Sequence, residues 1–173
     1  MMIETEHLLL VPYKIAFLEA TLIGDDKLTE VSGFQVAKQW PGVEFFFYLP
    51  FVLDELKANP EMEEWTYLVV LKENQTIIGE LSAQGNPGKN GIAEIGYGIV
   101  DEYGGNGYAT EASQSFIQWL VNYPILKIVA KTYQNHRKSQ HILRKLGFHK
   151  TGEELLGGDE VVYHFEYDSQ LKS

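Results

Sequence analysis

The chain has 173 residues, 45% of them hydrophobic and 22% charged, which is enough for one globular domain with a substantial core. It contains no cysteine, which excludes disulfides, thiolate catalysis and cysteine-based zinc sites. The formal net charge of −10 disfavours binding to nucleic-acid phosphates and favours attraction of cationic solutes such as amines. No apolar stretch approaches the ~20 residues that span a bilayer, and the acidic start lacks the basic segment of a signal peptide. We therefore expect a cytoplasmic protein that does not bind membranes.

The first 60 residues are predicted to form a strand followed by helices. Residues 7–11 are a short apolar run that indicates a first strand. Apolar side chains at helical spacing then predict a helix over residues 13–31, with a break at Gly24. Residues 32–50 are rich in aromatic side chains and are predicted to be irregular, and residues 51–58 predict a short helix.

From residue 65 the pattern changes to the period of two that is typical of strands. Residues 65–71 predict a strand, and residues 76–83 predict its antiparallel partner after a tight turn. Residues 85–91 then form a long turn that is rich in glycine and asparagine. The next strand is predicted over residues 92–100.

Helices and strands alternate in the last third of the chain. A helix over residues 107–122 and a strand over residues 126–132 complete a β-α-β crossover, which makes the two strands parallel. Asn135 is predicted to cap a second helix that ends at Gly147. The chain then continues as an antiparallel pair of strands, residues 148–153 and 160–167, around a glycine turn. The chain is therefore a mixed α/β protein.

A glycine-rich loop joins the strand at residues 92–100 to the helix that follows. Free backbone amides at the start of a helix, together with the helix dipole, form a site for an anion such as a phosphate. Glycine strand-to-helix turns are also common without any ligand. The loop is not a Walker loop, because no Lys-Ser or Lys-Thr pair follows Gly107, and its spacing does not fit a dinucleotide loop. On the preceding strand, Gly96 and Gly98 share one face with Glu94, which indicates close approach by a ligand or another backbone.

A second polar helix start follows the next strand. Residues 135–139 read Asn-His-Arg-Lys-Ser, and the helix ends in Leu-Gly-Phe. Two neighbouring parallel strands, each followed by a helix N-terminus, can diverge and leave a cleft at their carboxyl ends. A linear cofactor with phosphates at one end fits such a cleft.

These two segments resemble a known family. The sequence Y-G-G-N-G-Y-A-T-E-A at residues 103–112, followed by N-H-R-K-S-Q-H-I-L-R-K-L-G-F at residues 135–148, is similar to the GNAT (Gcn5-related N-acetyltransferase) superfamily. The A-E-I-G-Y strand at residues 93–97 resembles the branch of ribosomal-protein N-terminal acetyltransferases. The resemblance covers residues 65–167 and the first strand, whereas residues 13–60 match only loosely.

The resemblance implies one N-acetyltransferase domain over residues 1–173, with a variable region at 13–60 and a cofactor-binding core at 65–167. Its mostly antiparallel mixed sheet would be splayed at a central parallel strand pair and flanked by helices. Acetyl-CoA would lie between the two parallel strands, with its pantetheine arm on the strand backbone and its pyrophosphate on the loop amides. The cofactor-binding residues that the resemblance implies are Ile99, Val100, Gly104, Gly105, Asn106, Gly107, Tyr108, Ala109, Thr110, Asn135 and Ser139.

Three positions depart from the family pattern. Gly104 stands where the family usually has Gln or Arg, and His136 stands where it usually has Asn. Asn135 therefore either contacts the cofactor or only caps the helix. Leu143 occupies the position of the tyrosine general acid that many members carry.

The amine acceptor must lose a proton before it can attack the thioester. We expect Glu94 to be the base, directly or through water, because it is a carboxylate on a strand that should be largely buried. The alternative is that Glu94 is exposed or pairs with Lys or Arg. Glu80 on the adjacent strand is a weaker candidate, and Ser139 either protonates the leaving thiol or only packs. Glu111 is interpreted as structural, since a carboxylate in the first turn favours the helix dipole.

The predicted function is acetyl transfer from acetyl-CoA to an amine, which is a peptide or protein α-amine or a small-molecule amine. A second interpretation is a catalytically degenerate acyl-CoA-binding module, and a third is a nucleotide-binding α/β protein, for which no acidic ribose ligand is evident. No metal is expected, because His136 and His141 are five residues apart and do not share a helical face. We expect a monomer or a homodimer.

Overall fold

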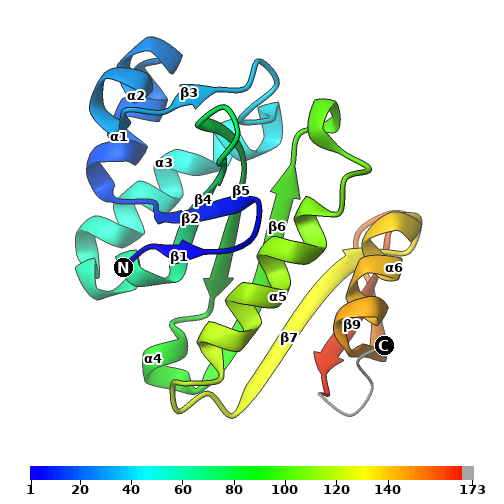
Figure 1. Cartoon of the computed structure of the whole chain (residues 1–173). Helices are drawn as coiled ribbons and strands as arrows, with labels where there is room; N and C mark the ends of the chain where they lie inside the picture. Colours follow the sequence, from blue (N-terminus) through cyan, green and yellow to red (C-terminus); the bar gives the residue numbers. More distant parts are fainter. Residues whose placement is uncertain (169–173) are drawn as a thin grey trace. The chain divides into compact units, whose positions relative to one another are not determined.

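The computed structural model describes residues 1–168 and divides the chain into two compact units (Figure 1). The first unit comprises residues 1–81 and 97–112, and the second comprises residues 82–96 and the chain from residue 113. Two strands and one helix contribute residues to both units. Within residues 1–168 no helix is both long and apolar enough to cross a bilayer.

The first unit is built on an antiparallel sheet. Its strands follow the order β1-β2-β4-β5-β6, and Leu8 of β2 pairs with Leu71 of β4. The short strand β3 adds a parallel ladder of two residues to β5. The bounds are β1 Ile3–Glu4, β2 Leu8–Pro12, β3 Gln35–Val36, β4 Thr66–Leu71, β5 Thr76–Gln84 and β6 Ile92–Ile99. The strands predicted at residues 7–11, 65–71, 76–83 and 92–100 are therefore confirmed.

Helices of the first unit differ in part from the prediction. The break expected at Gly24 is confirmed, because it separates α1 (Ile15–Ile23) from α2 (Asp25–Ser32). The prediction that residues 32–50 are irregular is wrong over its last eight residues, since α3 runs from Val43 to Ala58 with Pro50 inside it. One face of α3 is buried by three leucines at helical spacing, Leu49, Leu53 and Leu56. This burial outweighs the loss of one backbone hydrogen bond at Pro50.

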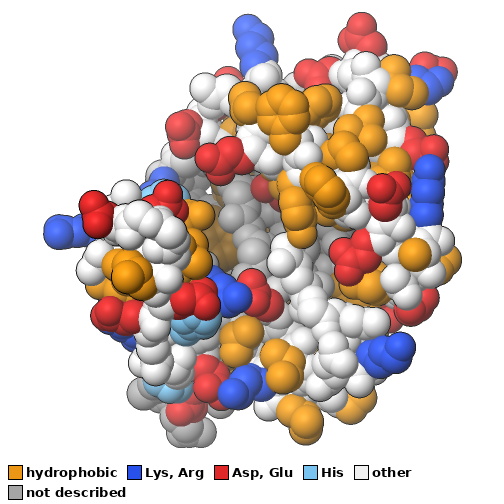
Figure 2. Space-filling model, turned by 180° about the vertical axis from the view of Figure 1, so that it is seen from behind, with side chains coloured by type: hydrophobic (Ala, Val, Ile, Leu, Met, Phe, Trp, Pro, Cys, Tyr) orange, Lys and Arg blue, Asp and Glu red, His pale blue; other side chains and the backbone are white. Residues whose placement is uncertain are grey.

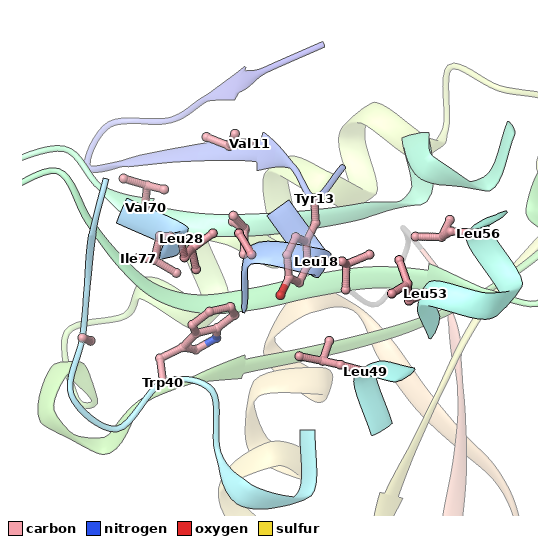
Figure 3. Close-up of a cluster of buried hydrophobic side chains, with 13 residues drawn as sticks. Val11, Tyr13, Leu18, Leu28, Trp40, Leu49, Leu53, Leu56, Val70 and Ile77 are labelled. Atoms are coloured by element: carbon pink, nitrogen blue, oxygen red, sulfur yellow. The ribbon is translucent and has the colours of Figure 1, made fainter. Parts of the chain in front are cut away.

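A buried cluster joins these helices to the sheet (Figure 3). Tyr13 is fully buried, and its hydroxyl shares a 2.7 Å hydrogen bond with the Thr21 hydroxyl. The ring of Tyr13 lies 6.0 Å from the ring of Trp40, at an interplanar angle of 54°. Trp40 of the aromatic segment after residue 32 therefore belongs to the core, whereas Phe47 and Tyr48 are exposed.

The second unit contains the predicted parallel pair. The first half of β6 runs parallel to β7 (Lys127–Tyr133), from Ile92 opposite Lys127 to Ile95 opposite Ala130. The strand order then continues as β6-β7-β9-β8 through two antiparallel ladders. The mixed, mostly antiparallel α/β fold predicted from the sequence is confirmed.

Helices of the second unit follow the predicted pattern closely. The remaining bounds are α4 Pro87–Asn90, α5 Tyr108–Leu120, α6 Arg137–Leu146, β8 Phe148–Leu155 and β9 Val161–Tyr167. Ser113, Phe116 and Leu120 form a buried face of α5. Val121 lies one residue beyond the end of the helix and is 56% exposed. Gly147 ends α6 with φ = 107°, a backbone conformation that favours glycine.

Candidate active site

The glycine loop of the first unit has the conformation that its sequence requires. Gly105 and Gly107 adopt φ values of 77° and 79°, which side chains with a Cβ rarely adopt. The first hydrogen bond that closes α5 runs from the Glu111 amide to the Gly107 carbonyl, at 2.9 Å. The amides of Tyr108, Ala109 and Thr110 precede that bond, and the first amides of a helix have no partner within it. The loop therefore has the geometry of an anion site.

Side-chain hydrogen bonds brace this loop from within. The Asn106 amide group donates to the Tyr103 and Gly104 carbonyls, at 3.1 and 3.3 Å. The Tyr103 hydroxyl in turn accepts a 3.2 Å hydrogen bond from the Asn74 side chain. Asn106 thus holds the loop in place through its side-chain NH2 group, which leaves its backbone amide for the cofactor contact that the sequence predicts.

At the end of β6, the backbone N–H and C=O groups of one residue point away from β5. The Val100 amide donates to the Ile78 carbonyl at 2.9 Å, and the Val100 carbonyl accepts from the Tyr103 amide at 3.0 Å. Because backbone groups alternate in direction along a strand, the N–H and C=O of Ile99 point away from β5. Of the two strand residues predicted to pair with pantetheine, Ile99 is therefore the better placed.

The most perturbed carboxylate is Glu80, on β5. Its Oε2 accepts a 2.6 Å hydrogen bond from the indole N–H of Trp40, within the first unit. Burial raises the pKa of Glu80 from an ordinary value of 4.5 to about 7, although the hydrogen bond from Trp40 acts in the opposite direction. A carboxyl group with this pKa exchanges a proton near neutral pH, as a general base must.

Two strand glycines make room beside Glu80. A Cβ added to Gly98 would lie 2.7 Å from Glu80 Oε1, and a Cβ added to Gly79 would lie 2.1 Å from the Gly98 carbonyl oxygen. Both separations are shorter than van der Waals contact. The close approach that the paired glycines of β6 predict is therefore present at Gly98, where a carboxylate and a neighbouring backbone meet.

Glu94, the carboxylate expected to be largely buried, has a different environment. Its side chain is 34% exposed, and its Oε1 lies 3.5 Å from the Lys131 ammonium on β7. The alternative of a pair with Lys is therefore what the structure shows, and the expected burial is wrong. Glu80 and Glu94 both lie within sequences that favour strands. The apolar residues around Glu80, in Thr-Ile-Ile-Gly-Glu-Leu at residues 76–81, were the stronger sign of burial.

The start of α6 in the second unit is held by a residue that sequence reasoning missed. The helix N-cap is His136 and makes no side-chain cap, so the expectation that Asn135 caps the helix is wrong. Instead, the buried side-chain amide of Gln140 donates to the carbonyls of Tyr133 and Gln134, at 3.1 and 2.8 Å. Asn135 is exposed and Ser139, in the first turn, is partly buried.

A buried hydroxyl at the end of β7 lacks a partner. Thr132 is 7% exposed, and among residues 1–168 its Oγ1 has no hydrogen-bond partner. Thr132 lies two residues beyond Ala130, the last β7 residue that pairs with β6. Buried polar groups nearly always have a partner in the protein, in water or in a ligand. This hydroxyl therefore fits a polar ligand that reaches the carboxyl end of β7.

Comparison with known proteins identifies the family. Residues 8–149 match the model of the acetyltransferase (GNAT) domain. The chain is 31% identical over 157 residues to the uncharacterized N-acetyltransferase YjdG of Bacillus subtilis strain 168, covering 88% of this chain and 94% of that relative.

Solved structures show the same fold at lower identity. A GnaT-family acetyltransferase from Bordetella pertussis has a TM-score of 0.71 at 16% identity, covering 97% of this chain and 99% of that one. The ribosomal-protein-S5-alanine acetyltransferase from Vibrio fischeri has a TM-score of 0.67 at 21% identity over 100% of both chains. RimL, a ribosomal L7/L12 α-N-protein acetyltransferase, has a TM-score of 0.67 at 19% identity, covering 98% and 99%. The chain belongs to the GNAT family of acetyltransferases, whose co-substrate is acetyl-CoA.

Proposed function

We propose that this protein transfers the acetyl group of acetyl-CoA to a primary amine by direct attack in a ternary complex, with Glu80 as the general base. The observation that carries the proposal is the half-buried carboxyl group of Glu80, which accepts a 2.6 Å hydrogen bond from Trp40 and whose pKa of about 7 suits proton transfer at neutral pH. We also propose that residues 1–173 act as one N-acetyltransferase domain in the cytoplasm.

The residues present fit acetyl-CoA. The amides from Gly105 to Thr110 would hold the pyrophosphate, and no atom lies within 4 Å of a Cβ built on Gly105 or Gly107, which leaves the loop open to a ligand. In the first unit, the backbone of Ile99 is proposed to pair with the pantetheine arm. In the second unit, the unpartnered Thr132 hydroxyl offers a hydrogen bond to a polar ligand at the carboxyl end of β7. The related structure of RimL is a complex with coenzyme A, which supports the same class of ligand here.

Glu80 would accept the proton of the incoming ammonium group. An α-amine, with a pKa of about 8, gives up this proton more readily than a lysine amine, with a pKa of about 10.4. The freed amine forms the new C–N bond at the thioester carbonyl as the C–S bond breaks. The nitrogen then releases a second proton to give the neutral amide, and the thiolate takes up a proton, so that one net proton leaves the site. We retain Ser139 as the proposed donor of the proton to the thiolate, since it lies in the first turn of α6.

The acceptor is proposed to be a peptide or protein α-amine or a small-molecule amine. Acidic side chains are spread over the face shown in Figure 2 and do not form a single patch. Together with the net charge of −10, they attract cationic acceptors of either kind.

The proposal is tested by release of free thiol from acetyl-CoA with a panel of peptides, polyamines, amino acids and aminoglycosides. Turnover with one class of acceptor is expected, and it identifies that class. Saturable binding of acetyl-CoA with no turnover on the whole panel would favour a binding module with a sensing or partner role. Absence of binding would contradict the proposed site.

Gly98→Ala is expected to lower kcat by about tenfold with little change in the KM for acetyl-CoA. The added Cβ would lie 2.7 Å from Glu80 Oε1, so the carboxylate must leave its position. An off-rotamer side chain costs about 0.5–1.5 kcal/mol, and about 1.4 kcal/mol corresponds to a factor of ten in rate. Steady-state kinetics checks the result, with Gly152→Ala as the matched control, because no atom lies within 4 Å of a Cβ built there. Equal effects of the two substitutions would contradict it.

A further inference from the structure

Three residues at the two ends of the first unit's sequence meet at the start of α5. Both oxygens of the Glu111 carboxylate are occupied by the turn between β1 and β2. The His7 amide donates to Oε2 at 2.8 Å, the Thr5 hydroxyl donates to the same oxygen at 2.5 Å, and His7 Nδ1 lies 2.8 Å from Oε1. A carboxylate at this position was interpreted from the sequence as a partner of the helix dipole alone.

The position of Glu111 creates an electrostatic problem for the proposed function. The carboxylate lies one residue after the amides of Tyr108, Ala109 and Thr110, which are proposed to hold the pyrophosphate. A negative charge in the first turn competes with a bound anion for the same end of the helix dipole, and it repels that anion directly. A positive charge beside the Glu111 carboxylate would relieve both effects.

We propose that His7 is a positioning residue for the coenzyme, which in its protonated form neutralises Glu111 and so permits tight binding of the pyrophosphate at the start of α5. This proposal rests on the proposed function, because it requires the coenzyme to bind at that helix start.

The surroundings of His7 favour the charged imidazolium. The hydrogen bond with Glu111 raises the pKa of His7 above its ordinary 6.5, and the pKa of Glu111 is lowered by its hydrogen bonds from Thr5 and His7 although burial acts against this. Glu6 Oε1 lies 3.8 Å from His7 Nε2 and adds to the rise, whereas Lys72 acts in the opposite direction. Lys72 is itself paired with Glu4 at 2.6 Å, and the ring of Tyr108 lies 6.0 Å from the His7 ring.

Calorimetric titration with free coenzyme A tests the proposal at pH 6.0 and pH 8.5. We expect His7→Gln to weaken binding by about fivefold at pH 6.0, and His7→Arg, which stays charged, to bind as the native protein does. His7→Arg should also lose less affinity than the native protein when the pH is raised from 6.0 to 8.5, because arginine keeps its charge over this range. Glu6→Gln is the matched control, since Glu6 is exposed and contacts only the far nitrogen of His7, and it should change the Kd by less than about twofold.

The double variant separates charge neutralisation from a mechanical tether. If His7 acts by neutralising Glu111, Glu111→Gln should bind coenzyme A at least as well as the native protein, and His7→Gln with Glu111→Gln should recover the affinity lost by His7→Gln alone. If Glu111→Gln weakens binding as much as His7→Gln does, the contact is only a tether and the proposal is overturned. Failure of the native protein to bind coenzyme A at either pH would instead overturn the proposed function.

Discussion

Replacing Glu80 by glutamine is expected to lower kcat for acetyl transfer by about 10²- to 10⁴-fold, the usual contribution of a general base. Glutamine preserves the shape of the side chain and can still accept the hydrogen bond from Trp40 Nε1, so the surrounding core should not change. The Kd for acetyl-CoA, measured by calorimetry, should remain within about twofold, since the loop amides that are proposed to bind it are untouched. The loss of kcat with an unchanged Kd is therefore the specific signature of a missing base.

Glu94→Gln is the matched control for this experiment. Glu94 is partly exposed and pairs with Lys131 at 3.5 Å, and such surface pairs contribute about 0–1 kcal/mol. We expect its kcat to fall by less than about threefold. A large loss in Glu94→Gln with full activity in Glu80→Gln would reverse the assignment and restore the base predicted from the sequence.

The pH dependence of kcat gives an independent readout of the same group. If Glu80 must be deprotonated to act, kcat at saturating substrates should rise with pH through a midpoint near 7, which is the pKa that burial gives this carboxyl group. Any residual activity of Glu80→Gln should lack that midpoint.

The sequence was sufficient to predict the glycine loop and the helix start after it, but not the environments of Glu80 and Glu94. The glycines at positions 105 and 107 are recognisable because a helix start and a positive φ each favour particular residue types, and both preferences are local. The choice between Glu80 and Glu94 depends on which side chain Trp40 and Lys131 reach, and these contacts join residues 37 to 40 positions apart in the chain. Strand periodicity contains no information on such pairs.

The difference between local preferences and contacts made in the folded protein also explains two wrong predictions, the irregular segment before residue 50 and the cap at Asn135. Pro50 is a local signal that argues against a helix, but α3 passes through it because the buried leucines on one face contact the rest of the core. Asn135 is a good capping residue by type, yet the helix has no side-chain cap, and Gln140 instead ties the helix to the preceding segment by donating to the carbonyls of Tyr133 and Gln134. In both cases a contact made in the folded protein outweighed the preference of a single residue.

The burial that suits Glu80 to catalysis is expected to reduce the stability of the protein as pH rises. Because the pKa of Glu80 is raised from 4.5 to about 7 in the folded protein, the folded protein retains a proton between these pH values that the unfolded chain has released. The contribution of this carboxyl group to stability is therefore complete below about pH 4.5 and is lost as pH rises through about 7. The full shift corresponds to up to about 3 kcal/mol.

Urea unfolding of the native protein and of Glu80→Gln, at pH 5 and at pH 8, measures this effect. Glutamine at position 80 does not titrate. The free energy of unfolding of Glu80→Gln minus that of the native protein should therefore increase by up to about 3 kcal/mol from pH 5 to pH 8. His7 and Glu111 also titrate differently in the folded protein, but they are present in both proteins and cancel in the difference. Parallel pH dependences would mean that Glu80 titrates as an ordinary exposed glutamate, and the main argument for it as the base would be lost. The expected divergence would show that Glu80 titrates with a raised pKa, and a higher free energy of unfolding of Glu80→Gln at pH 8 would show that the substitution which removes the activity also stabilises the fold.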